Sequence, residues 1–226
     1  MLPRLCICAT LMIAAIPAPA QDPVLARIDA AAAKFQGMSA KVDHITHTAV
    51  INDDSKESGT VKWRKVSANQ LQGLLNFTQP DSRILLFKDR KLQIFTPASN
   101  SVQVYDLSRY SGQIEQFLMI GFGTPLAEIQ RAYTIAVKDR AVLGGKTTTR
   151  IELVPRSPEG LKRVTKMELW IPDGAGYPIQ EKVHEPSGDS EAWVYSDVVI
   201  NPSPPLKDAD LKLNLPKNVQ FIYPQK

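Results

Sequence analysis

The sequence predicts a single domain of the α+β class, mainly β, organised around an antiparallel sheet that curls. The central observation is residues 83–107, where three short apolar runs are separated by polar turns. The runs are rich in β-branched and aromatic residues and the separators hold Asp, Pro, Asn and Ser, which together indicate a β-meander. A second series of strand-like runs, punctuated by Gly and Pro, follows residue 132. One helical pattern precedes the first strands and another separates the two series.

The first run of the meander, residues 84–87, is apolar at four successive positions. A strand with one solvated face would alternate apolar and polar residues instead. Both faces of this strand should therefore be covered by something apolar. With 226 residues, the chain is long enough for one substantial core.

An N-terminal amphipathic helix is expected between Asp22 and Gly37. Asp22 can cap its amino end, Pro23 suits the first helical position, and Gly37 suits the end. Its apolar side recurs at helical spacing, with Val24, Ile28, Ala31 and Phe35.

Strands make up most of the remaining chain. They are expected at residues 41–51, 60–66, 71–78, 84–87, 92–95, 102–105, 133–142, 147–155, 164–171, 179–185 and 191–200. Because side chains alternate along a strand, one face of 71–78 should carry Leu71, Gly73, Leu75 and Phe77. Residues 52–59 have the polar composition of a turn. Helical spacing is found at 110–123 and 124–133, and a further turn and an edge strand are expected within 206–223.

The first twenty residues have the features of a cleavable secretory signal. Arg4 gives a positive start, residues 5–16 are apolar, and Ala18 to Ala20 form an A-x-A site, so cleavage is expected after Ala20. Cys6 and Cys8 lie inside this segment, so the mature domain, residues 21–226, would contain no cysteine. No later stretch approaches eighteen apolar residues, so we expect a soluble mature protein in the periplasm.

Several function classes lack support in the sequence. A net charge of +4 at pH 7 is too slight to argue for nucleic acid as a partner. Residues 121–123 read Gly-Phe-Gly without a third glycine or a preceding strand, so a dinucleotide site is not supported. There is no G-x-S-x-G and no H-E-x-x-H motif. We therefore expect neither an enzyme nor a cofactor.

The histidines and the basic residues allow both a functional and an ordinary interpretation. His44 and His47 are three residues apart, but on a strand they face opposite sides, so solvated or edge-strand histidines are preferred over a metal site. A scattered basic set has the composition of a solvated face, with a docking surface for an acidic partner as the alternative. It consists of Lys62, Arg64, Lys65, Arg83, Lys88, Arg90 and Lys91.

The order of elements and several motifs resemble the outer-membrane lipoprotein carrier family, the LolA-like proteins of Gram-negative envelopes. The likeness is most specific at residues 59–106, where a Gly-led strand is followed by Phe77-Thr78-Gln79-Pro80-Asp81, Ile84-Leu85-Leu86 and Phe95-Thr96-Pro97. The same family pattern is found at residues 117–123, at Leu153-Val154-Pro155 and at Leu215-Pro216-Lys217-Asn218-Val219. The resemblance thus spans nearly the whole mature chain.

The resemblance implies a curved, unclosed antiparallel β-barrel, or half-barrel, with a helical lid over an apolar concave face. In the family this cavity holds the acyl chains of lipoproteins, which an inner-membrane ATP-driven exporter loads and an outer-membrane receptor unloads. A monomer without cofactor is the corresponding expectation. This chain departs from the pattern in two places: Lys65 stands nearest to the family's lid-closing Arg, and Lys88-Asp89 replaces the usual Asp-Gly turn.

The resemblance also selects the residues that would contact lipid. Leu75, Phe77 and Leu85 match inward-facing positions of the family cavity. Strand alternation or helix face adds the other candidates, which are Trp63, Phe87, Ile94 and Phe117. A packed core would use the same residue types, and only the resemblance favours a cavity.

Two alternatives use the same fold. One is a carrier of another envelope lipid. The other is a sensor or scaffold like the envelope-stress regulators, which carry a second domain for which we expect no room in this length. A hydrolase, the alternative from a different class, would need a paired nucleophile and base that the sequence does not offer.

Overall fold

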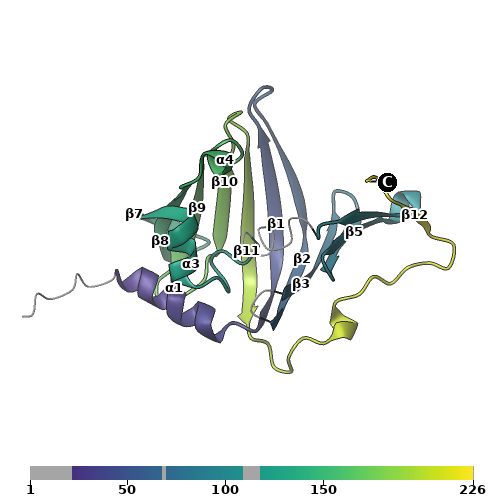
Figure 1. The fold of residues 1–226 in the computed structure, drawn as a ribbon, viewed down its shortest axis with the longest axis horizontal. Coiled ribbons are helices and arrows are strands. Elements are labelled where there is room, and N and C mark those ends of the chain that lie inside the picture. The colour runs from purple at the N-terminus through teal and green to yellow at the C-terminus, as the bar shows by residue number, and fades with distance from the viewer. Residues whose placement is uncertain (1–21, 68–69, 109–117, 226) are drawn as a thin grey trace, which may run out of the picture.

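The computed structural model describes residues 22–67, 70–108 and 118–225, and a twelve-stranded sheet dominates it (Figure 1). The strands follow one another in space in the order β12-β6-β5-β4-β3-β2-β1-β11-β10-β9-β8-β7. Neighbouring strands are antiparallel, except that β12 runs parallel to β6. The sheet curves without closing, because β7 and β12 remain its two edges. The predicted mainly β, unclosed antiparallel architecture is confirmed.

Along the sequence, the strands run from the middle of the sheet outward to one edge and then return from the other edge. From β1, the first half builds one wing with β1 (Gly37–Thr48), β2 (Asp53–Ser67), β3 (Gln70–Gln79), β4 (Arg83–Lys88), β5 (Lys91–Thr96) and β6 (Ser101–Asp106). The second half returns toward β1 from the other edge with β7 (Tyr133–Leu143), β8 (Lys146–Pro155), β9 (Lys166–Pro172), β10 (Gln180–His184) and β11 (Ser190–Ile200). The edge strand β12 (Gln220–Ile222) lies near the C-terminus. Pairing of β1 with β11 joins the two wings.

The first helix forms where the sequence predicts it. In α1 (Pro23–Lys34) the Asp22 carboxylate accepts a hydrogen bond from the Val24 amide at 3.0 Å, and Pro23 occupies the first turn. The buried stripe continues through Ala32 and not through the expected Ala31, because Ala32 extends the four-residue spacing of Val24 and Ile28.

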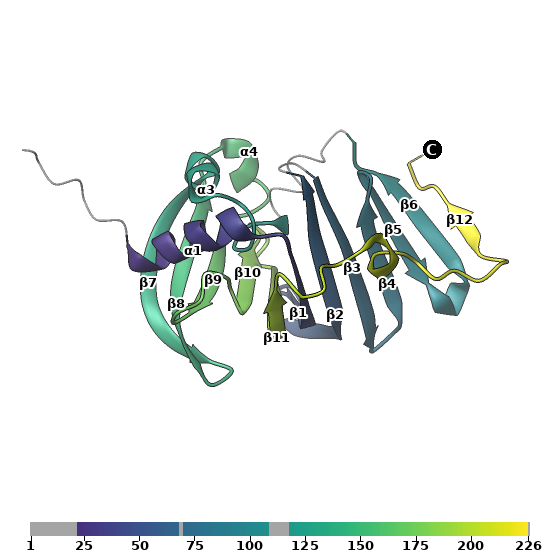
Figure 2. The same cartoon turned by 90° about the horizontal axis from the view of Figure 1, so that it is seen from below.

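The second described helix, α3 (Leu126–Ala132), begins after Pro125. The Asp29 carboxylate of α1 accepts a hydrogen bond from the Leu126 amide at 2.9 Å, so α1 supplies the cap of α3. Both helices lie over β7–β9 (Figure 2), where they bury a cluster with that wing. The remaining short elements are α4 (Pro158–Leu161), η1 (Pro97–Ser99) and η2 (Asp208–Asp210).

Residues 52–59, expected as a turn, belong mostly to β2, because their polar side chains pair across to β1: the Asp43 carboxylate accepts from the Ser58 hydroxyl at 2.6 Å and pairs with Lys56 at 2.9 Å. Of the helix expected at 110–123, residues 110–117 lie outside the described part of the chain. The described remainder is a set of turns in which the Met119 carbonyl accepts from the amides of residues 122–124.

Strand alternation divides the first wing into two faces. We call the face that carries Trp63, Leu75 and Leu85 the inner face; the outer face carries Arg64 and Leu86. Leu86 and Phe87 are both buried although they lie on opposite faces, so the prediction that both sides of this strand are covered is confirmed.

The outer face of the first wing is crossed by the C-terminal segment, residues 201–219, on its way from β11 to β12 (Figure 2). Arg64 hydrogen-bonds the Leu206 carbonyl and pairs with Asp208, which also lies 3.3 Å from the Lys88 ammonium. Leu211, in the same segment, is fully buried. The expected last turn and edge strand are present as η2 and β12.

Candidate functional site

An apolar cavity of about 380 Å³ lies on the inner face of the sheet, between its two wings. One wall comes from the first wing, with Val61, Trp63, Leu75, Leu85, Phe87 and Leu92. The opposite wall comes from β9, β10 and β11, with Met167, Glu181, Val183, Glu191, Trp193 and Tyr195. Leu107 and Leu118, from the chain between β6 and α3, complete the lining.

Local sequence explains why these side chains converge. In β3 the buried Leu71, Leu75 and Phe77 share one face with Gly73, whose missing side chain makes room for the indole of Trp63. A Cβ atom at Gly73 would lie only 1.9 Å from that ring. The glycine therefore allows Trp63 to lie across β3 on the inner face of the sheet.

Four of the seven residues that the sequence selected line this cavity: Trp63, Leu75, Leu85 and Phe87. Two others lie on the same face but outside the lining. Phe77 is fully buried beneath Arg83, whose guanidinium carbon is 5.4 Å from the ring centroid. Ile94 pairs with Leu85 across β4 and β5. Phe117 lies outside the described residues.

The wall from β9–β11 was not assigned from the sequence. Its residues were placed in strands without a face, and no family motif marked them. The alternation of Glu191, Trp193 and Tyr195 in β11 is the signal that predicts one shared face, because side chains two residues apart point to the same side of a strand.

A polar cluster around His44 adjoins the cavity. Its Nδ1 lies 3.3 Å from Glu57 and its Nε2 3.4 Å from Glu191, and the ring stacks on Trp193 with centroids 3.9 Å apart. Arg83 pairs with Glu57 at 2.5 Å. His44 is therefore not the solvated or edge-strand residue expected from the sequence, because β1 lies in the middle of the sheet.

Hydrogen bonding by His44 also lowers the pKa of Glu191, so this carboxyl is ionised at neutral pH. The other histidine of the pair, His47, faces the opposite side of β1 and lies 2.7 Å from Asp54. No group of three or more His, Cys, Asp or Glu side chains suited to a metal ion occurs in the described ranges.

Glu181 of β10 is the member of the cavity wall whose hydrogen bonding is incomplete. Its Oε2 accepts a hydrogen bond from the Tyr195 hydroxyl at 3.4 Å, and its Oε1 is buried without a hydrogen-bond partner among the described residues. Burial raises the pKa of Glu181 from 4.5 to about 8, and the bond from Tyr195 opposes that rise only in part. At neutral pH this side chain is therefore a protonated carboxyl, which can both donate and accept a hydrogen bond.

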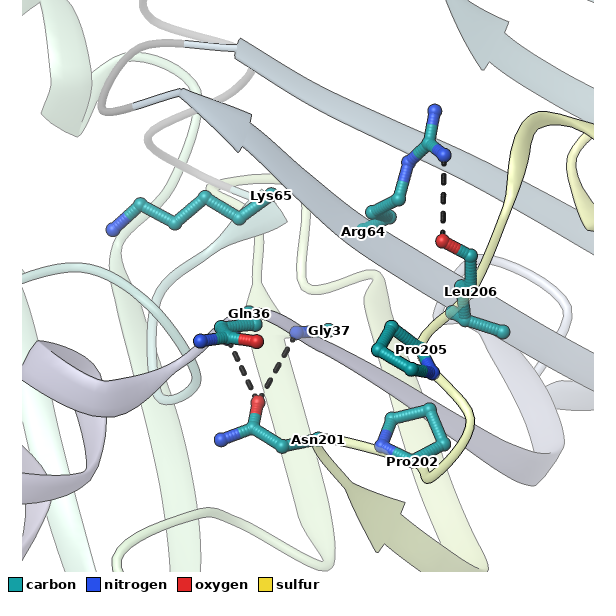
Figure 3. Close-up of a pocket in the computed structure, with 8 residues that line it drawn as sticks. All are labelled: Gln36, Gly37, Arg64, Lys65, Asn201, Pro202, Pro205 and Leu206. Atoms are coloured by element: carbon teal, nitrogen blue, oxygen red, sulfur yellow. Dashed lines mark hydrogen bonds between the residues drawn. The ribbon is translucent and has the colours of Figure 1, made fainter.

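A second, smaller cavity of about 180 Å³ lies where the C-terminal segment leaves β11 (Figure 3). Asn201 closes it on one side, since its Oδ1 accepts hydrogen bonds from the Gln36 and Gly37 amides at 2.7 and 3.3 Å. Arg64, on the other side, is held by the Leu206 carbonyl. These bonds join the C-terminal segment to β1, to β2 and to Gln36, which precedes β1, so this cavity lies where the segment packs against the rest of the fold.

Three members of the basic set, Lys62, Arg64 and Lys88, have acidic partners in the C-terminal segment. Asp208 pairs with Arg64 and Lys88, and Asp210 lies 3.9 Å from Lys62. Lys65, the position nearest to the family's lid-closing Arg, makes no ion pair among the described residues. In the part of the chain that is described, no helix is long and apolar enough to cross a membrane.

No protein-family model matches the sequence, and no curated protein matches it in sequence. Solved structures match in backbone. An uncharacterized conserved protein from Thermus thermophilus is 11% identical, with a TM-score of 0.54 over 88% of this chain and 96% of that chain. MucB is 12% identical, with a TM-score of 0.52 over 87% of this chain, which spans 63% of the MucB chain. A LolA superfamily protein from Nitrosomonas europaea is 14% identical, with a TM-score of 0.40 over 84% of this chain and 96% of that chain.

At these identities the first two likenesses show a shared fold. The backbone agreement with the third is too low to carry an argument. The chain therefore shares its overall fold with the Thermus protein and with MucB.

Proposed function

We propose that this chain is a LolA-like carrier, or chaperone, that holds the acyl chains of lipoproteins in its inner-face cavity while they pass from the inner to the outer membrane. The observation that carries the proposal is the apolar cavity between the wings, in which the sequence-selected Trp63, Leu75, Leu85 and Phe87 meet. Its volume of about 380 Å³ lies within the roughly 300–1,000 Å³ that is typical of small-ligand sites.

Energetics favour such a cavity for an acyl chain. Each methylene removed from water contributes about 0.8 kcal/mol, so a chain of ~16 carbons needs roughly 12 kcal/mol of shelter. An aromatic and aliphatic wall can supply that shelter without a covalent step. On this proposal the protein is a periplasmic monomer that contributes to outer-membrane biogenesis, is loaded by an ATP-driven exporter and is unloaded by an outer-membrane receptor.

The pair Glu181 and Glu191 favours one alternative, an acid–base hydrolase. The two carboxyls line one cavity and their pKa values are displaced in opposite directions. The rest of the wall is apolar, however, and gives a polar substrate little to orient it. We therefore propose a carrier and not an enzyme.

Mass spectrometry of what co-purifies with the protein from the periplasm tests the proposal directly. Triacylated proteins would support a lipoprotein carrier. Free lipids would favour a carrier of another envelope lipid. A protein that co-purifies with neither, and that binds no apolar probe, would overturn the proposal.

We expect the purified domain to bind an environment-sensitive apolar dye while it remains folded. The dye should enter the preformed inner-face cavity, because apolar surface there is already accessible in the native state. Dye fluorescence and near-ultraviolet circular dichroism are measured together through a denaturant titration. A signal that rises only as the protein unfolds would indicate a closed core.

We also expect mature protein isolated from the periplasm to begin at Gln21 and to contain no cysteine. The segment concerned, residues 1–20, lies outside the described residues, so the expectation rests on its sequence alone. Intact-mass measurement decides the matter. A lipid attached to the N-terminus would contradict both the cleavage site and the soluble carrier.

A further inference from the structure

Glu191 places an accessible charge on the wall of the inner-face cavity. It lies on β11, on the same face as Trp193 and Tyr195, and all three side chains line the cavity. Glu191 is the first of the three along the strand, one residue after Ser190, so it stands at one end of the cavity. Its side chain is 45% exposed, so a ligand in the cavity can reach the carboxylate without any rearrangement of the wall.

The hydrogen bonding of Glu191 leaves one of its two oxygens open to a ligand. Oε2 lies 3.4 Å from Nε2 of His44, and no described residue donates a hydrogen bond to Oε1. Because His44 also lowers the pKa of this carboxyl, Glu191 carries a negative charge at neutral pH. An ionised carboxylate accepts hydrogen bonds and donates none, so its open oxygen requires a donor.

The rest of the lining supplies no positive charge. The described residues that line the cavity include no Lys, Arg or His. Glu181, the other carboxyl of the lining, adds no positive charge in either of its protonation states. The charge on the described wall is therefore negative, and an anionic head would find no counter-charge there.

A row of charged side chains continues from Glu191 across the neighbouring strands. His44 of β1 lies between Glu191 and Glu57 of β2, with its Nδ1 3.3 Å from the Glu57 carboxylate, and Arg83 of β4 pairs with that same carboxylate at 2.5 Å. The guanidinium of Arg83 packs over Phe77, outside the lining, and so does not face a ligand in the cavity. His44 is charged only when protonated, so this row of four residues is neutral at most and never positive.

We propose that Glu191 binds a cationic group at the polar end of an acyl chain, so that the cavity prefers chains that carry an amine to chains of the same length that end in an anion. An ammonium group donates charge-assisted hydrogen bonds, which are stronger than neutral ones. The indole of Trp193 lies about 7 Å along the same face, two residues away, and also attracts cations. A chain that packs against Trp193 would therefore bring its polar end to the carboxylate.

The inference rests on the proposed function and specifies the head of its ligand. Two kinds of ligand carry the required amine beside an acyl chain. One is an aminolipid, with the amine in its headgroup. The other is a lipoprotein with a basic side chain next to its acylated end.

Displacement of the bound, uncharged dye by dodecylammonium, dodecanol and dodecanoate, each below its micelle-forming concentration, tests the proposal. The wild-type protein should bind dodecylammonium most tightly and dodecanoate least. The difference between the two ions should narrow in high salt, because salt screens a half-exposed charge pair. Equal affinities for the two ions, or a preference that salt leaves unchanged, would overturn the inference whether or not any variant folds.

Glu191→Gln should weaken dodecylammonium binding by about three- to tenfold and leave dodecanol and the dye nearly unaffected, since a half-exposed charge contributes modestly. Glu191→Lys should reverse the order and favour dodecanoate. Glu185→Gln removes an exposed carboxyl just beyond β10 and outside the cavity lining, so it is the matched control and should behave as wild type. Folded Glu191 variants that keep the wild-type preference would show that another group receives the amine.

Two further pairs of ligands identify the source of the amine. N-palmitoyl peptides with lysine or glutamine next to the acylated residue represent a lipoprotein, and phosphatidylethanolamine and phosphatidylglycerol represent envelope lipids. Tighter binding of the lysine peptide would assign the site to lipoproteins, and tighter binding of phosphatidylethanolamine would assign it to an aminolipid. Equal binding within both pairs would overturn the inference alone. A wild-type protein that binds neither the dye nor any of these ligands would overturn the proposed function as well.

Discussion

Glu181→Gln is expected to stabilise the protein at neutral and mildly alkaline pH. Burial raises the pKa of Glu181 from 4.5 to about 8, so between these values the folded protein retains a proton that the unfolded chain has lost. The free energy of unfolding of the wild-type protein should therefore fall as the pH rises, by up to about 1.4 kcal/mol per pH unit. Glutamine carries no titrating proton, so the variant lacks this dependence.

The difference in unfolding free energy between the wild-type protein and the Glu181→Gln variant should be constant at both ends of the pH range. Below about pH 4.5 Glu181 is protonated in both states, so the wild-type and variant curves should run parallel. Above about pH 8 it is ionised in both states, and the difference between the proteins should reach a plateau. Chemical denaturation across this range measures both curves. Glu185→Gln, at an exposed position, is the control and should follow wild type.

If the unfolding free energies of the wild-type protein and of Glu181→Gln depended on pH in the same way, Glu181 would not be a buried carboxyl with a raised pKa.

Local signals in the sequence were sufficient for α1 and for most of the strands of the first wing. The cap of α1 by Asp22 and Pro23 and the alternation of Leu71, Gly73, Leu75 and Phe77 depend on neighbours only a few residues away. The meander was predictable for the same reason, since β3 to β6 are joined by short connections and pair in chain order.

Local signals do not predict which strands pair when they are far apart in the sequence. β2 extends back to Asp53 only because β1 lies beside it and offers polar partners such as Asp43 and His47. The second cavity wall depends on β1 pairing with β11, across about 150 residues of chain. Glu181 could be assigned to a strand from the sequence, but its burial depends on the pairing of β1 with β11, which brings the two wings together.

The basic residues show how tertiary context changes an interpretation. Taken alone, Lys62, Arg64 and Lys88 suggested a solvated face or a docking site for an acidic partner. The structure supplies Asp208 and Asp210 from the chain itself, more than a hundred residues later. Electrostatic complementarity here holds the C-terminal segment against the sheet.

Leu85 distinguishes a ligand cavity from a closed core. It lies in the middle of β4, lines the inner-face cavity and is only partly buried, unlike Leu153, which is 1% exposed in the cluster beneath α1 and α3. Leu153→Ala should cost about 2–5 kcal/mol of stability, because it leaves a void in a packed core. Leu85→Ala should cost well below that range, because it only enlarges space that is already open.

Leu85→Trp should show the opposite asymmetry. A larger side chain in a closed core costs about 1–3 kcal/mol through overpacking, whereas at Leu85 it can extend into the cavity of about 380 Å³ and leave folding nearly intact. The indole would then occupy volume that an acyl chain needs, so this variant should be folded and secreted but poor at keeping a lipoprotein in solution. Denaturant midpoints and a lipoprotein release assay from membranes measure the two effects. An unfolded Leu85→Trp variant, together with a wild-type protein that binds no lipid, would show that Leu85 belongs to a closed core.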